Sequence, residues 1–226
     1  MRNFVFGAAA VVALAGAASA ANLAAFSFEL SPPSGPGPHT ADAGLFAASS
    51  NIRGSHVSGA TVYDNPVGNG SVESFSSNNW AIGDFYEIRT NTLGYTAITF
   101  QWDQVSSNTG PRDFNLQIST DGGANYVNVL INQISRANAS PAWSSGTPTG
   151  IDTHGPTALG AAAANLADLR IRITMNTSVS ANGGTVASGG TSRIDDVVVA
   201  GTLIPTPGAL ALMAGAGLVG LRRRRA

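Results

Sequence analysis

Apolar and polar side chains alternate with a period of two through most of the middle of the chain. Ile98, Phe100 and Trp102 fall on one face of such a stretch, and polar residues fall on the other. The segments 112–120 and 168–176 repeat the alternation. Successive side chains of a β-strand point to opposite faces, so this period predicts strands with one buried and one polar face.

Further segments with the same period are 24–30, 59–64, 84–90, 126–134 and 193–201. Only the alanine-rich 156–169 indicates a helical turn, with a loop as the alternative. The pattern predicts about eight to ten antiparallel strands, which favours an all-β fold with two packed sheets. We therefore expect residues 21–203 to form one antiparallel β-sandwich of jelly-roll type.

A tight hairpin is predicted between two of these strands. The segment 119–126 contains Asp121, Gly122 and Gly123, and adjacent glycines supply the positive φ angles that a tight turn requires. The segment also matches the Asp-box pattern of β-propellers, but it occurs once, whereas a propeller repeats it. We interpret it as a hairpin whose turn is capped by the aspartate.

Charge narrows the possible partners. Between Ala21 and Ile204 the chain has seven arginines, no lysine and thirteen carboxylates, a net charge of −6. Nucleic-acid surfaces need clustered cations, so this class of partner is excluded. The chain contains no cysteine, which removes disulfides, thiolate metal sites and cysteine nucleophiles.

The first residues have the pattern of a secretory signal peptide. Arg2 precedes an apolar run over 4–14, and small residues over 18–20 form an A-x-A cleavage site. We expect the export machinery to recognise residues 1–20 and cleavage to follow Ala20.

The last residues, 204–226, combine three features in a fixed order. A Pro-x-Pro break precedes an apolar run over 209–221, and four arginines follow that run. The run is shorter than the ~20 residues that span a bilayer. The residues expected to carry sorting and processing are Pro205, Thr206, Pro207, Arg222, Arg223, Arg224 and Arg225.

A signal peptide followed by a secreted body and this tail resembles the PEP-CTERM proteins of Gram-negative bacteria, here with Pro-Thr-Pro in place of Pro-Glu-Pro. The resemblance implies processing by an exosortase-like membrane peptidase, with the tail transiently in the inner membrane as a short apolar helix. It also implies a secreted or cell-envelope location on the outer surface, in organisms that make extracellular polysaccharide.

A second resemblance concerns carboxylates on the first and last predicted strands. Glu29 follows Phe28 early in the chain, and Asp195 and Asp196 lie in the last strand. An early Phe-Glu and a late Asp-Asp resemble the carbohydrate-binding modules of jelly-roll type, in which such residues hold a structural Ca²⁺. Alternation places Asp195 and Val197 on one face, with Asp196 on the other. The alternative is a pair of solvated acids beside Arg193.

Two tryptophans lie in polar surroundings outside the best strand patterns. One interpretation of Trp80 and Trp143 is that their rings are exposed and stack on sugar rings. The other is that they are loop residues whose rings fold back onto the core. Trp102, in phase with Ile98 and Phe100, is expected in the core.

The chain lacks a recognisable catalytic pattern. Its three histidines are far apart in sequence, in segments rich in glycine, serine or proline, and are expected in surface loops. No HExxH motif or GxSxG elbow occurs. We therefore expect a non-enzymatic protein of the cell surface or extracellular matrix. The alternatives are a jelly-roll carbohydrate-binding module that binds extracellular polysaccharide and, third, a secreted hydrolase.

Overall fold

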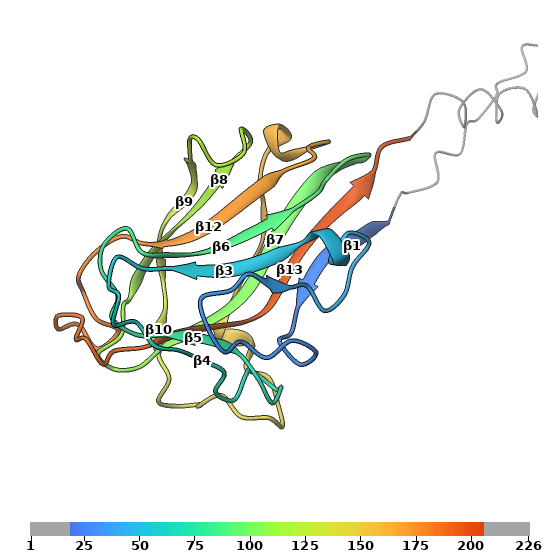
Figure 1. The fold of residues 1–226 in the computed structure, drawn as a ribbon. Coiled ribbons are helices and arrows are strands. Elements are labelled where there is room, and N and C mark those ends of the chain that lie inside the picture. Colours follow the sequence, from blue (N-terminus) through green and yellow to red (C-terminus); the bar gives the residue numbers. More distant parts are fainter. Residues whose placement is uncertain (1–18, 206–226) are drawn as a thin grey trace, which may run out of the picture.

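A computed structural model describes residues 19–205, which form a two-sheet β-sandwich of jelly-roll type (Figure 1). The predicted all-β fold is thereby confirmed. The strands are β1 (Ala20–Phe26), β2 (His39–Thr40), β3 (Asn51–Ser55), β4 (Tyr63–Asp64), β5 (Phe75–Ser77), β6 (Phe85–Thr90), β7 (Tyr95–Ser106), β8 (Asp113–Ser119), β9 (Val127–Ile134), β10 (Arg136–Ala137), β11 (Thr153–Ala158), β12 (Leu169–Met175) and β13 (Ser192–Leu203).

Short 3₁₀ turns complete the described elements: η1 (Ala47–Ser49), η2 (Gly150–Asp152) and η3 (Ala161–Ala163). The last of these lies in the alanine-rich segment for which a helical turn was predicted. No helix within residues 19–205 has the length and apolar character needed to cross a membrane. The signal peptide and the apolar C-terminal helix predicted from the sequence lie outside the described residues.

The strands divide into a seven-stranded and a six-stranded sheet. The seven-stranded sheet has the order β10-β7-β13-β5-β4, with β1 also paired to β13 and β11 to β7. The six-stranded sheet has the order β2-β3-β6-β12-β8-β9. All pairings are antiparallel except that of β10 with β7. More strands form than the period predicts, because two-residue strands such as β2 are too short to display it.

The core lies between the sheets and consists of the apolar faces that the alternation predicted. Ile98, Phe100 and Trp102 of β7 are buried, as expected. They face the buried side chains of β8 and β12 across the sandwich, which alternate in the same way. Burial of these faces supplies the main favourable free energy of folding.

One strand departs from simple alternation. A bulge interrupts the pairing of β13 with β7 between Asp195 and Val198, and Asp196 has a φ of 44°. An extra residue shifts the following side chains to the opposite face. Val197 therefore enters the core, while Asp195 lies on the outer face. The expectation that these two residues share a face is wrong.

The predicted hairpin forms between β8 and β9. Gly122 and Gly123 have φ values of 74° and 93°. Asp121 Oδ1 accepts hydrogen bonds from Ser119 Oγ and Asn125 N. These bonds hold the pKa of Asp121 well below its usual range. The interpretation as a turn capped by aspartate is confirmed.

Candidate functional site

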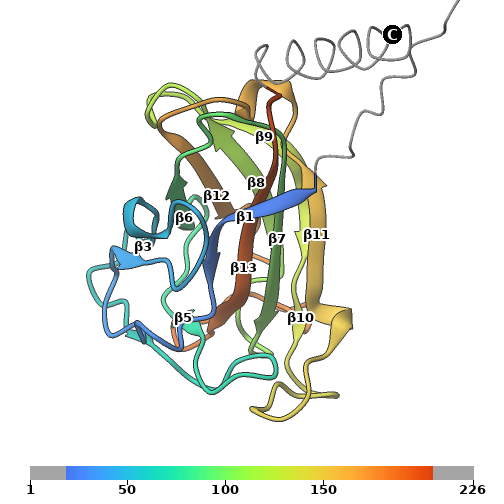
Figure 2. The same cartoon turned by 90° about the vertical axis from the view of Figure 1, so that its right-hand side faces the viewer.

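Neighbouring strands of the seven-stranded sheet place a row of side chains on its outer face. Strand β13 lies between β5 and β7 (Figure 2). Arg193 of β13 pairs with Ser76 of β5 on one side and with Val105 of β7 on the other. Asp64 of β4 pairs with Ser76 and extends the row. Ile194, the next residue after Arg193, is in the core, so Arg193 faces outward. The row forms the floor of a groove.

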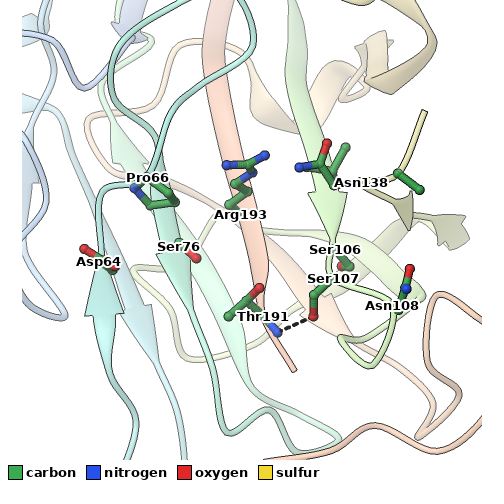
Figure 3. Close-up of a pocket in the computed structure, with 11 residues that line it drawn as sticks. Asp64, Pro66, Ser76, Ser106, Ser107, Asn108, Asn138, Thr191 and Arg193 are labelled. Atoms are coloured by element: carbon green, nitrogen blue, oxygen red, sulfur yellow. Dashed lines mark hydrogen bonds between the residues drawn. The ribbon is translucent and has the colours of Figure 1, made fainter. Parts of the chain in front are cut away.

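The groove has a volume of about 510 Å³, within the size range of ligand pockets (Figure 3). Strand residues form its floor, and the loops after β7 and β10 and before β13 form its sides. The lining residues are Asp64, Pro66, Ser76, Val105, Ser106, Ser107, Asn108, Asn138, Ala139, Thr191 and Arg193.

Several polar groups in the groove remain available for a ligand. The side chains of Asn108 and Thr191 make no hydrogen bond to other described residues. Asn138 Oδ1 accepts a bond from Trp143 N at 2.9 Å, which leaves the amide NH₂ free of protein partners within 19–205. Ser107 Oγ accepts a bond from Thr191 N at 2.9 Å and keeps its own proton to donate (Figure 3).

Arg193 differs from the other arginines between residues 19 and 205. Its Nη1 donates to the carbonyl oxygen of Val67 at 2.7 Å, and its guanidinium lies 4.9 Å from the ring centre of Trp143. No described carboxylate lies within ion-pair distance of it. Burial lowers the pKa of Arg193. The arginines that do form ion pairs are Arg53, Arg89, Arg112, Arg136, Arg170 and Arg172.

A buried carboxylate fixes the loop that carries Trp143. Asp152 Oδ2 accepts hydrogen bonds from Trp143 Nε1 at 2.8 Å, Thr149 Oγ1 at 2.7 Å and Arg136 Nη2 at 2.7 Å. Arg136 Nε lies 2.7 Å from the other oxygen of Asp152. The indole is thereby held in place beside Arg193.

A second carboxylate fixes the loop between β4 and β5. Asp195 Oδ2 accepts hydrogen bonds from Asn69 N at 2.8 Å and Ser71 Oγ at 2.5 Å, and Asn69 Nδ2 donates to Asp103 Oδ2. Asp195 is fully buried, and burial raises its pKa to about 7. We name Asp195, Asn69, Ser71 and Asp103 the loop clamp. It positions Val67, whose carbonyl holds Arg193.

Neither tryptophan proposed to stack on sugars offers an exposed face. Trp80 is 6% exposed; its Nε1 donates to Ser77 O, and its ring packs 4.3 Å from that of His56. Trp143 is 4% exposed. Of the two alternatives drawn from the sequence, both tryptophans follow the second: each folds back against the protein and satisfies its indole N–H there. Trp143 contributes to the site by positioning Arg193.

Of the carboxylates predicted to hold Ca²⁺, Asp195 and Asp196 lie on β13, and Glu29 lies in the segment after β1. Strands β1 and β13 pair with each other, as expected for the first and last strands. Glu29 Oε1 accepts a hydrogen bond from Glu73 N at 2.8 Å, and Asp195 Oδ1 accepts one from Asp196 N. Burial, followed by the charges of Asp103 and Glu29, raises the pKa of Asp196. Within residues 19–205, no three carboxylate or histidine side chains are grouped as a metal ion requires. The Ca²⁺ site stays a prediction without geometric support.

The structure also forms a serine–histidine–aspartate arrangement in the interior. His56 Nδ1 lies 3.4 Å from Asp84 Oδ2, and His56 Nε2 lies 3.2 Å from Ser77 Oγ. Ser77 is 1% exposed, and its hydroxyl also bonds Tyr86. The expectation of a surface histidine is wrong for His56. Ser77 is enclosed in the described structure, and His56 Nδ1 is buried without a hydrogen-bond partner there, so the three side chains do not form a hydrogen-bonded triad.

Of the residues expected to carry sorting, two fall within the described part. Ala20 is the first residue of β1, and Pro205 follows β13. Thr206, Pro207 and the four arginines lie outside it. Their predicted role stays a prediction.

Sequence reasoning missed the groove itself. Asn108, Asn138 and Thr191 lie in segments rich in Asn, Ser and Thr, as do many residues of this chain. Arg193 was considered only as a neighbour of Asp195. Its lack of an acidic partner depends on tertiary packing, which the order of residues does not reveal.

No protein-family model matches the chain, and no curated protein matches it in sequence. Among solved structures, it is similar to the K2 cleaved adhesin domain of Lys-gingipain, with 12% identity and a TM-score of 0.46 over 77% of this chain and 96% of that one. The K1 adhesin domain from Porphyromonas gingivalis W83 gives 14% identity and a TM-score of 0.43, covering 67% and 90% of the two chains.

A third similarity is to TmCBM61, solved in complex with β-1,4-galactotriose. The identity is 10% and the TM-score 0.35, over 66% of this chain and 86% of that one. At these values none of the three similarities assigns a ligand or an activity to this chain.

Proposed function

We propose that this protein is a non-catalytic component of the bacterial surface or extracellular matrix that binds polysaccharide through the groove on its seven-stranded sheet. One observation carries the proposal: amide, hydroxyl and guanidinium groups without described side-chain partners gather in one open groove. Sugars present many hydroxyl groups, which donate and accept hydrogen bonds, and Asn, Ser and Thr side chains match both roles.

The rigid frame around the groove supports this proposal. Strands β5, β13 and β7 supply the floor, and buried carboxylates hold the loops on either side. A pre-organised site loses less conformational entropy on binding than a flexible one. A carbohydrate-binding module was the alternative drawn from the sequence, and the polar lining of the groove supports that proposal.

Groove variants test the proposal. In N108A/T191V, two groups that face the groove no longer hydrogen-bond a ligand, and we expect affinity for a bound polysaccharide to fall about tenfold. Binding is measured on an array of neutral and acidic polysaccharides and quantified by affinity electrophoresis. The control is N128A, on β9 of the other sheet, which should bind like the unmodified protein. Equal binding by all three proteins would contradict the proposal.

We also propose that the tail sorts the protein to the envelope through an exosortase-like peptidase. Support comes from the sequence order of Pro-x-Pro, apolar run and arginines. Mass spectrometry of the intact protein from the envelope tests this: the expected product lacks Arg222 to Arg225. A mature protein that still ends in the four arginines would contradict it.

A further inference from the structure

We propose that the groove selects acidic polysaccharide, with Arg193 receiving a negatively charged group of the sugar chain. This inference rests on the proposed polysaccharide-binding function and names the class of ligand. Its starting point is that Arg193 is the only arginine in the described range 19–205 without a carboxylate partner.

The position of Arg193 makes the missing partner significant. Exposed arginines need no partner, because water solvates them. Arg193 is half-buried and lies in the floor of the groove. Burial lowers its pKa although the charges of Asp195 and Asp152 act in the opposite direction, and neither carboxylate lies within ion-pair distance. A cation partly removed from water loses hydration, and a bound anion compensates for that loss. The groove is therefore most complementary to a ligand that carries a negative charge at this point.

The guanidinium is also held in a fixed place. The Val67 carbonyl accepts a bond from Nη1, and the guanidinium carbon lies over the Trp143 ring, 4.9 Å from its centre. The remaining N–H groups have no hydrogen-bond acceptor among the described residues. A planar guanidinium fixed in this way can donate to a carboxylate or sulfate through two bonds.

The rest of the lining fits an acidic sugar better than a small anion. Asn108, Asn138 and Thr191 offer neutral donors and acceptors along the groove, as sugar hydroxyl groups require. One acid, Asp64, also lines the groove and is exposed. Because the body carries a net charge of −6, a polyanion gains nothing from non-specific attraction. Any preference for acidic polymers must therefore come from a local site.

The experiment compares each charged polymer with a neutral polymer of the same backbone. Polygalacturonate and its fully methyl-esterified form share a backbone, and dextran sulfate with dextran separates sulfate from carboxylate. We expect the protein to bind a charged polymer more tightly than its neutral partner. The variant R193Q should lose at least about tenfold in affinity for the charged polymer and little for the neutral one. R193K should recover part of the preference, because it keeps the charge but not the fork geometry.

A second variant acts in the opposite direction. D64N removes the one acid of the groove, so affinity for the charged polymer should rise about two- to fivefold. Because Asp64 is exposed, this variant should keep the wild-type melting temperature, and it therefore tests the inference even where R193Q fails to fold.

The outcomes separate this inference from the function on which it rests. One outcome is that the protein binds charged and neutral polymers equally well and that R193Q or D64N leaves these affinities unchanged. This result would overturn the selection of acidic sugars and leave polysaccharide binding intact. Binding to none of the polymers would overturn both. Binding of charged polymer that N108A/T191V does not weaken would place the site elsewhere and overturn the inference.

Discussion

Two buried carboxylates, Asp152 and Asp195, hold the loops beside the groove in place. Asp195 would be a solvent-facing acid by its position in β13, yet the loop between β4 and β5 covers it completely. Its oxygens accept bonds from Asn69, Ser71 and the backbone of Asp196. A carboxylate that organises three neighbours in this way links the protonation state of one residue to the stability of a loop.

Asp195 should make stability depend on pH. Its pKa is raised from the ordinary value of about 3.9 to about 7, so the folded state holds the proton more tightly than the unfolded state. The stability that follows is fully present below about pH 4 and is lost as the pH rises through about 7. The variant D195N keeps an acceptor oxygen but cannot ionise. Its stability should therefore not fall in this way as the pH rises.

We therefore compare the unfolding free energies of D195N and the unmodified protein. Between pH 4 and pH 8 the difference between them should change by about a few kcal/mol in favour of D195N. Urea unfolding at each pH measures the difference. His56 and His154, whose pKa values burial lowers, act in the opposite direction below about pH 6.5. Both histidines are present in both proteins, so their contributions cancel in the difference between the two unfolding free energies. A difference that stays constant across this range would contradict the role assigned to Asp195.

At the scale of the elements, alternation predicted the strands and their buried faces but not the bulge of β13. The pattern around Ile98, Phe100 and Trp102 is regular, because side chains of that part of β7 alternate between the core and the outer face. In β13, the extra residue at Asp196 adopts a positive φ, which only backbone geometry reveals. The positions of the loops that cover the outer face could not be predicted from the sequence either, because hydrogen bonds between distant segments hold these loops.

The loop clamp depends on a glycine. A methyl group on Gly68 would collide with Ser71 Oγ, Asp195 Oδ2 and the carbonyl oxygen of Glu73. We expect G68A to lower the unfolding free energy by about 1–3 kcal/mol, as overpacking does. Because Val67 is adjacent, the variant should also weaken polysaccharide binding.

A matched control exists in the preceding loop. A methyl group on Gly59 would meet no atom within 4 Å, and the φ of Gly59 lies outside the left-handed region, so G59A should unfold like the unmodified protein. Thermal unfolding and affinity electrophoresis of both variants test the clamp. If G68A matches G59A in melting temperature, the loop is not held as described.

At the scale of the whole molecule, the antiparallel pairing of β1 with β13 brings the two described ends together: Ala20 lies opposite Thr202. Arg193 is near the beginning of the same strand and Leu203 at its end. About ten residues of extended chain cover roughly 33 Å. The groove and the two described ends of the chain therefore lie at opposite ends of β13, so a bound polysaccharide meets the protein far from where the described chain begins and ends.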